Sequence, residues 1–245
     1  MISKYLGEDV FMAGIRRYVK KHAYGNTRTE DLWEALSEES GKDVSNVASI
    51  WTKKVGYPVL TVSESGNQIT IKQNRFLTTG DVKPSEDETL YWILLGLKTL
   101  NKEGKPVISE ELTTTLRETT ITIPDESNGF YKLNTNHSGI YRVAYTPERL
   151  EKLGAFARSH PGVLTTEDRA GLVADTGALC ASGYSKTTGL MNLISGWKNE
   201  DEYVYVLLVT PLIQCVGRDS CEGHCVGDGM DLRAKGRERC FDRFY

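Results

Sequence analysis

The stretch G-I-Y-R-V-A-Y-T-P-E at residues 139–148 decides the order of structural elements. Tyr141, Val143 and Tyr145 share one face of an alternating pattern, which predicts a strand. Residues 146–148 then combine a capping hydroxyl, a proline that the first helical position tolerates, and an acid near the positive end of the helix dipole. The chain is therefore expected to pass here from strands to helices.

Short strands are predicted before this point, from about Tyr57 onward. Leu60 and Val62 alternate with polar residues until the turn at residues 65–67, after which a second alternating run predicts a hairpin. Further alternating runs lie at residues 91–97, 121–123 and 131–133, separated by turn residues such as those at 102–105. Because a sheet with one apolar face must bury it, residues 57–145 are expected to form a small antiparallel β-sandwich.

Residues 1–56 have helical periodicity. The first six residues read as the last turn of a helix that Gly7 stops, as expected of a chain that begins inside a longer protein. A later helix is expected to have Thr29 as its cap and Gly41 at its end. Gly56 and Pro58 then end the helical pattern.

Helices are predicted again from residue 146 to about residue 204. Residues 165–168 repeat the start signal, and Leu190, Leu193 and Trp197 form an apolar stripe. Since stacked helix pairs bury their apolar faces against one another, this stripe is expected to be exposed unless later residues cover it. Residues 205–245 lose all periodicity and are expected to be a divergent, disordered tail.

Composition excludes some classes of partner. The 245 residues carry a formal net charge of −3, which gives no reason to expect a nucleic-acid or anionic-membrane partner. No stretch approaches the ~20 apolar residues that span a bilayer, and the N-terminus lacks a signal-peptide pattern. A reducing, cytoplasmic setting is therefore expected.

Several local motifs occur in an order that resembles one enzyme family. The stretch H-A-Y-G-N-T at residues 22–27 precedes D-L-W at 31–33 and W-T-K-K-V-G-Y-P-V at 51–59. N-R-F-L at 74–77, Y-W-I-L-L at 91–95, G-I-Y-R-V-A-Y at 139–145 and D-R-A-G-L-V-A-D at 168–175 follow, and then W-K-N-E-D-E-Y-V at 197–204. Together they resemble the zinc aminopeptidases of the gluzincin type, the puromycin-sensitive aminopeptidase family.

The resemblance implies an α+β multidomain fragment. Residues 1–56 would be the C-terminal helices of a thermolysin-like catalytic domain, and residues 57–145 the antiparallel β-sandwich domain. Residues 146–204 would begin an all-helical, superhelical-array domain, and residues 205–245 match nothing in the family. The motifs depart from the family pattern at Asn74, where Glu is common, and at Leu94, where a proline is expected.

The residues that carry the family's chemistry do not occur in this sequence. Family enzymes bind zinc through H-E-x-x-H and a distant Glu, and hold the substrate amine with G-A-M-E-N. None of the four histidines precedes a glutamate, and G-A-M-E-N is missing. Tyr5 and Tyr18 do not match the family's oxyanion-stabilising tyrosine. No catalytic, cofactor-binding or metal residue can be assigned, so zinc belongs only to the full-length family.

Other candidate residues favour structural roles. The tail spacing Cys221-x-x-His224-Cys225, with Cys215 and Cys240 outside it, fits no standard pairing of zinc knuckles. His22 lies on an apolar helix face, and His137 lies in a turn. The trio of Asp168, Arg169 and Asp175 fits a helix cap and an interdomain ion pair better than a catalytic constellation.

Two functions remain open. The first is a non-catalytic fragment of an aminopeptidase that removes N-terminal residues from peptides, inactive alone and in contact with the missing catalytic and C-terminal domains. The second is a stand-alone interaction module built on the β-sandwich, which binds a partner such as a full-length aminopeptidase through strand or helix contacts.

Overall fold

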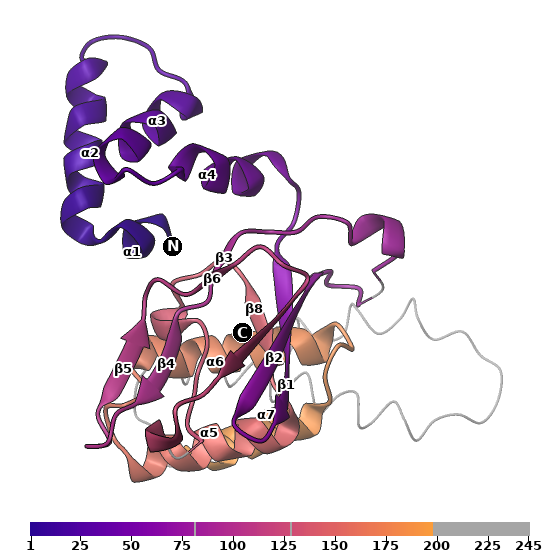
Figure 1. Ribbon diagram of the computed structural model, residues 1–245. Coiled ribbons are helices and arrows are strands. Elements are labelled where there is room, and N and C mark those ends of the chain that lie inside the picture. The colour runs from indigo at the N-terminus through magenta and orange to yellow at the C-terminus, as the bar shows by residue number, and fades with distance from the viewer. Residues whose placement is uncertain (81, 128, 198–245) are drawn as a thin grey trace, which may run out of the picture. The chain divides into compact units, whose positions relative to one another are not determined.

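The computed structural model describes residues 1–80, 82–127 and 129–197 (Figure 1). Four helices come first: α1 (Ile2–Leu6), α2 (Glu8–Lys21), α3 (Thr29–Ser40) and α4 (Val44–Lys53). The backbone N–H of Arg28 donates to the Asp31 carboxylate at 2.7 Å, and α3 starts directly after Arg28. The helix thus starts at Thr29, as predicted, but its N-cap is Arg28, so the prediction that Thr29 is the cap is wrong. Gly41 ends α3 in the left-handed conformation, as predicted.

The four helices share a small core. Leu6, Leu36 and Val44 are buried together between α1, α3 and α4. Helix α2 comes close to α3 at Gly14, where an added Cβ would lie 2.7 Å from Leu36 Cδ2. A larger residue at this position would force the two helices apart.

Aromatic residues join these helices to the strands. The rings of Tyr5 and Trp92 meet at 4.7 Å between centroids, and those of Trp51 and Tyr91 at 4.9 Å. The indole Nε1 of Trp51 donates to the Trp92 carbonyl at 3.0 Å. The joint therefore combines apolar burial with one directional bond.

The largest sheet has four strands in the order β7-β2-β1-β8. Their bounds are β1 (Pro58–Ser65), β2 (Gln68–Arg75), β7 (Glu118–Thr122) and β8 (Arg142–Ala144). The hairpin of β1 and β2 forms as predicted around residues 65–67, but β8 pairs with β1 in parallel. This sheet is therefore mixed rather than purely antiparallel. A tight hairpin requires antiparallel pairing, whereas the long connection that leads to β8 also allows parallel pairing with β1.

Two smaller antiparallel pairs complete the β-rich segment. Strand β3 (Ile93–Leu94) pairs with β6 (Thr113–Thr114), and β4 (Leu97–Leu100) with β5 (Pro106–Ser109). The strand predicted at residues 131–133 is reduced to a single bridge between Lys132 and Lys98. Three short 3₁₀ turns also occur, η1 (Pro84–Glu86), η2 (Asp125–Ser127) and η3 (Thr135–His137).

Within the described residues, three helices follow the strands: α5 (Pro147–Ser159), α6 (Thr166–Ala181) and α7 (Thr187–Ser195). Both predicted caps are present. The hydroxyl of Thr146 accepts from the N–H of Arg149, and that of Thr165 from the N–H of Asp168, each at 3.2 Å. The described chain therefore has an α+β architecture, with helices before and after the strands.

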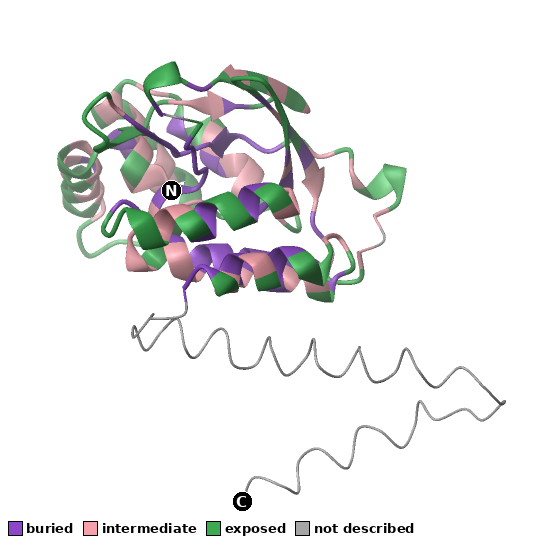
Figure 2. Ribbon diagram, turned by 90° about the horizontal axis from the view of Figure 1, so that it is seen from below, coloured by how far each residue is buried: buried purple, intermediate pink, exposed green. Residues whose placement is uncertain are grey.

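The apolar stripe of α7 is buried instead of exposed. Leu190 and Leu193 are fully covered and Trp197 is 7% exposed. Helix α7 reaches α5 closely at Gly154, where an added Cβ would lie 2.7 Å from the carbonyl oxygen of Leu193. The expected exposure of this stripe is wrong because α5 supplies the partner surface. In Figure 2 the helices show buried residues along one side and exposed residues along the other.

The predicted tail at residues 205–245 and the last residues of the predicted helical segment lie outside the described residues. All residues that the structure describes belong to one unit. Within them, no helix is both long and apolar enough to cross a membrane.

Candidate functional site

Buried and half-buried carboxylates join the sheet side of the molecule to the C-terminal helices. The most buried of them is Asp168, in the first turn of α6, with no exposed surface. One of its oxygens accepts from Lys98 Nζ of β4, and the other accepts from Lys132 Nζ at 2.9 Å. Both lysine side chains are 2% exposed. A single carboxylate thus holds two cations, one from β4 and one from the residue bridged to it, against a helix N-terminus.

Further hydrogen bonds fix the positions of the Asp168 and Lys132 side chains in this cluster. Asp168 also accepts the backbone N–H of Asn136 at 2.7 Å, and Lys132 Nζ donates to the carbonyls of Leu133 and Asn134. Three acceptors around Lys132 match the three donors of an ammonium. Burial lowers the pKa of Lys132. Burial acts to raise the pKa of Asp168, but Lys132 and Lys98 outweigh it and hold that pKa below its usual value.

The loop held by Asp168 has an unusual backbone. Asn134, Asn136 and His137 have φ values of 56°, 54° and 49°, in the left-handed region that non-glycine residues rarely adopt. Asn134 secures this shape through its side chain, which accepts from the N–H of Gly139 at 2.8 Å. Strained residues of this kind persist only where their surroundings over-determine them. The Asp168 bond to Asn136 is one such constraint.

A second carboxylate, Asp175, joins α6 to β8. It accepts from Arg142 Nη1 and from the backbone N–H of Val143, each at 3.1 Å. Arg142 also lies over the rings of Tyr57 and Phe76. Burial raises the pKa of Asp175 to about 7, against the opposing effect of Arg142. The parallel strand is thereby tied to the helix through its backbone as well as its side chain.

A third carboxylate, Glu64 of β1, pairs with Arg149 of α5. Arg149 Nε and Nη2 each donate to a different Glu64 oxygen at 2.7 Å, which is a bidentate pair. Tyr131 donates its hydroxyl to Glu64 at 2.8 Å, and the Arg149 guanidinium stacks 4.1 Å from the centre of the Tyr131 ring. Arg149 Nη1 also donates to the Gly129 carbonyl at 2.8 Å.

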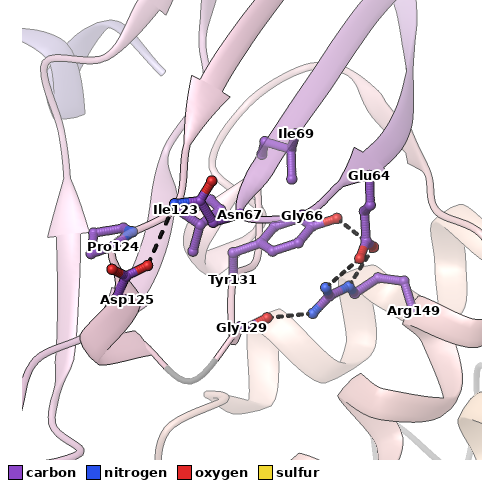
Figure 3. Close-up of a pocket in the computed structure, with 10 residues that line it drawn as sticks. All are labelled: Glu64, Gly66, Asn67, Ile69, Ile123, Pro124, Asp125, Gly129, Tyr131 and Arg149. Carbon is purple, nitrogen blue, oxygen red and sulfur yellow. Dashed lines mark hydrogen bonds and ion pairs between the residues drawn. The ribbon is translucent and has the colours of Figure 1, made fainter.

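A pocket of about 350 Å³ lies beside this pair (Figure 3). The Arg149 pair holds the pKa of Glu64 below its ordinary value, and burial raises the pKa of Tyr131. Glu64 therefore stays ionised and Tyr131 stays neutral at physiological pH. Neither group is poised to exchange a proton near pH 7, as a general acid or base must be. The pair instead joins β1 to α5.

The candidate residues from the sequence do not form one functional site. Asp168 belongs to the capping box of α6, as predicted, and Asp168 and Asp175 each form their own ion pairs. That the Asp175 pair joins two domains stays a prediction. Arg169 donates to the Leu164 carbonyl at 2.8 Å. His137 forms the predicted turn, and burial lowers its pKa. His22 ends α2 half-buried, with its ring beside Tyr18.

Lys98, Lys132, Glu64 and Arg149 were not predicted as functional residues. Lys98 had a usable signal, because it is a single cation in the apolar run at residues 91–100. A charge in such a run must be paired if the strand is buried. The other three follow ordinary polar patterns, and only the folded structure brings them to their partners.

The described residues do not fit a zinc site. No group of three or more His, Cys, Asp or Glu side chains in this part of the chain is arranged to hold a metal ion. The cysteines and histidine of the spacing at residues 215–240 lie outside the described residues. Zinc thus enters only through the family resemblance.

Comparison with known proteins identifies two family segments. Residues 1–51 match the Peptidase family M1 domain, and residues 130–211 match the ERAP1-like C-terminal domain. Aminopeptidase 2 of Candida albicans is 53% identical over 205 residues, which cover 83% of this chain and 21% of that protein. Aminopeptidase 2, mitochondrial, of Saccharomyces cerevisiae is 51% identical over 205 residues, which cover 83% of this chain and 20% of that protein.

The alanine/arginine aminopeptidase of Saccharomyces cerevisiae is 49% identical over 204 residues, which cover 83% of this chain and 22% of that protein. The chain therefore spans about a fifth of the length of these relatives. The two matched segments occur in the order that the sequence motifs predicted. The second begins within the β-rich region and continues to residue 211, so the expectation that the family resemblance stops at residue 204 is wrong. The chain belongs to the M1 family of aminopeptidases.

Proposed function

We propose that this chain is the non-catalytic supporting part of a zinc aminopeptidase that removes N-terminal residues from peptides. One observation carries the proposal: the carboxylates that join strands to helices are all occupied by fixed donors. Asp168 alone binds Lys98, Lys132 and the backbone of Asn136. Groups satisfied in this way hold segments together and are not themselves free to act as a nucleophile or base.

The sequence supports the same division of roles. It contains neither H-E-x-x-H nor G-A-M-E-N, so we propose that the catalytic, cofactor-binding and metal residues are contributed by other parts of the enzyme. Within this proposal residues 1–56 close the catalytic domain and residues 57–145 form the sandwich domain. Residues 146–204 begin the helical domain, and the peptides and zinc belong to the whole protein.

An activity assay tests the proposal. Purified chain is expected to leave aminoacyl-naphthylamides uncleaved, with or without added zinc, because its sequence lacks the H-E-x-x-H motif whose glutamate activates water in the family. A segment containing H-E-x-x-H from one of the yeast relatives, mixed with the chain, supplies the positive control for complementation. Turnover by the chain alone that a chelator abolishes, and that persists after host aminopeptidases are removed, would refute the proposal.

A second candidate function is an interaction module that binds a full-length aminopeptidase. Strand β7 favours it, because β7 lies at the edge of the four-stranded sheet and alternates exposed with half-buried residues. An edge strand offers free backbone groups for pairing with another chain. Thr120→Pro in β7 should abolish co-elution with a full-length aminopeptidase. No co-elution of the unaltered chain removes this candidate.

The cellular setting is also a proposal. We propose a cytoplasmic location, while one yeast relative bears the word mitochondrial in its name. Fractionation of cells that express the tagged chain distinguishes the two compartments.

A further inference from the structure

The pocket beside the Glu64–Arg149 pair combines charged walls with an apolar floor. Ile69 and Ile123 form the floor and are 2% and 3% exposed. The turn between β1 and β2 and the start of η2 form the rim (Figure 3). Its volume of about 350 Å³ is at the lower end of the range for small-molecule sites.

Among the described residues that line the pocket, the one cation, Arg149, is not available to a ligand. Arg149 uses Nε and Nη2 on Glu64 and Nη1 on the Gly129 carbonyl. Its side chain is 7% exposed and packs on the Tyr131 ring. Turning it toward a bound anion would break the bidentate pair. The pocket therefore does not suit a carboxylate or phosphate ligand.

Asp125 is the charge that remains without a balancing cation. The Asn67 side chain donates to it at 3.4 Å, a long bond from a neutral amide. Within the described residues, no lysine, arginine or histidine nitrogen lies within ion-pair distance of Asp125. Since Arg149 cancels Glu64, the lining has a net charge of one negative unit, placed at the rim above apolar side chains.

We propose that this pocket binds an alkylammonium group, with the ammonium on Asp125 and the alkyl stem over Ile69 and Ile123. An amine on a short carbon chain matches both parts of the lining, because such chains bury their methylene groups and keep the charged end in water. A lysine side chain of a peptide and a free diamine share this chemistry. Binding is weak, since the carboxylate is exposed.

A nuclear magnetic resonance titration of the full chain tests the site. The probes are N-acetyl-lysine N-methylamide, putrescine, and the uncharged N-acetyl-norleucine N-methylamide. The two ammonium probes should give saturable shifts confined to residues 64–69, 123–125, 129–131 and 149. The norleucine probe should bind at least about fivefold more weakly, because it lacks the charge. Binding of only one ammonium probe assigns the source as peptide or diamine, and either result supports the site.

Matched variants separate charge from fold. Asp125→Asn keeps the shape of the rim and should weaken both ammonium probes by about fivefold. Asp9→Asn, an exposed acid on α2, should leave their binding unchanged. The proposal is overturned if neither ammonium probe gives saturable shifts at these residues, or if Asp125→Asn binds as well as the unaltered chain. Equal binding of the norleucine probe by the unaltered chain overturns it without any variant.

Discussion

At the scale of single residues, Asp168 has the largest effect on the joint between strands and helices. Its oxygens form ion pairs with two lysines that have almost no exposed surface, and they also fix the strained loop at Asn136. Removing one partner of a buried ionic group leaves the other charges without compensation. The two buried lysines therefore depend on this one carboxylate for their ion pairs.

Asp168→Asn should lower the free energy of unfolding by about 3–5 kcal/mol, because Lys98 and Lys132 would remain buried without their counter-charge. Urea denaturation followed by circular dichroism measures this change. Glu30→Gln provides the matched control, since Glu30 pairs with Lys53 at 3.8 Å on the surface and should change little. Adding Lys132→Met to Asp168→Asn should restore part of the loss. A fully additive second loss would contradict the ionic explanation.

Asp175 gives the joint a pH dependence. Burial raises its pKa to about 7 in the folded chain, whereas an aspartate in an unfolded chain titrates near 3.9. Between these values the folded state binds a proton that the unfolded state does not. The contribution of Asp175 to stability is therefore fully present below about pH 4 and is lost as the pH rises toward 7.

The difference in unfolding free energy between the unaltered chain and Asp175→Asn should consequently change with pH. From about pH 4 to 7 it should move in favour of Asp175→Asn, with a slope of at most about 1.4 kcal/mol per pH unit. Denaturation curves at four pH values give this slope. A difference that is flat over this range would show that Arg142 keeps Asp175 ionised throughout.

At the scale of elements, glycines set how closely the C-terminal helices pack. A Cβ at Gly154 of α5 would lie 2.7 Å from the backbone carbonyl oxygen of Leu193 in α7. A Cβ at Gly189 of α7 would instead meet Leu150 Cδ1, the end of a flexible side chain, at 2.9 Å. A side chain can turn away, whereas a helix backbone must shift as a whole. The two positions therefore tolerate a methyl group differently.

Gly154→Ala should destabilise the chain by about 1–3 kcal/mol, because the displaced helix outweighs the ~1 kcal/mol that alanine gains in helix propensity. Gly189→Ala should cost less than Gly154→Ala. Thermal unfolding of both variants compares them directly. If Gly154→Ala proves as stable as Gly189→Ala, close contact between α5 and α7 is not what orders them.

At the scale of the whole molecule, Trp51 connects the N-terminal helices to the strands. Its indole N–H donates to the Trp92 carbonyl, while the ring packs on Tyr91. Trp33 offers a contrast, because its buried indole Nε1 has no hydrogen-bond partner in the described chain. Replacing tryptophan by phenylalanine thus removes a hydrogen bond at position 51 and none at position 33.

Trp51→Phe should cost about 0.5–1.5 kcal/mol for the lost hydrogen bond and raise amide exchange in α1 to α4. Exchange in β1 and β2 should stay unchanged, since their bonds do not involve Trp51. Hydrogen–deuterium exchange read by mass spectrometry reports both regions. Trp33→Phe should leave the exchange of α4 as it is, and an equal effect of both variants would argue against the hydrogen bond.

Local patterns could predict much of this fold. The caps at Thr146 and Thr165 and the hairpin around Gly66 depend on neighbouring residues, so the sequence around them contains the necessary information. The parallel pairing of β8 and the burial of Leu193 depend on distant partners, and no periodicity encodes them. Of the candidate site, the structural role of Asp168 and Asp175 was predictable from helix position. Their partners were not, because strand pairing brings Lys98 and Lys132 together.

The parallel pairing of β8 with β1 also determines when the sheet can be completed during synthesis. The β1–β2 hairpin closes a short loop and can form as soon as both strands leave the ribosome. The other edge of β1 pairs with β8, which is not available until residue 142 has emerged, because Val59 pairs with Arg142. Until then the open edge of β1 can pair with a neighbouring nascent chain. Slow translation between these residues therefore lengthens the interval in which the chain is exposed to misassembly.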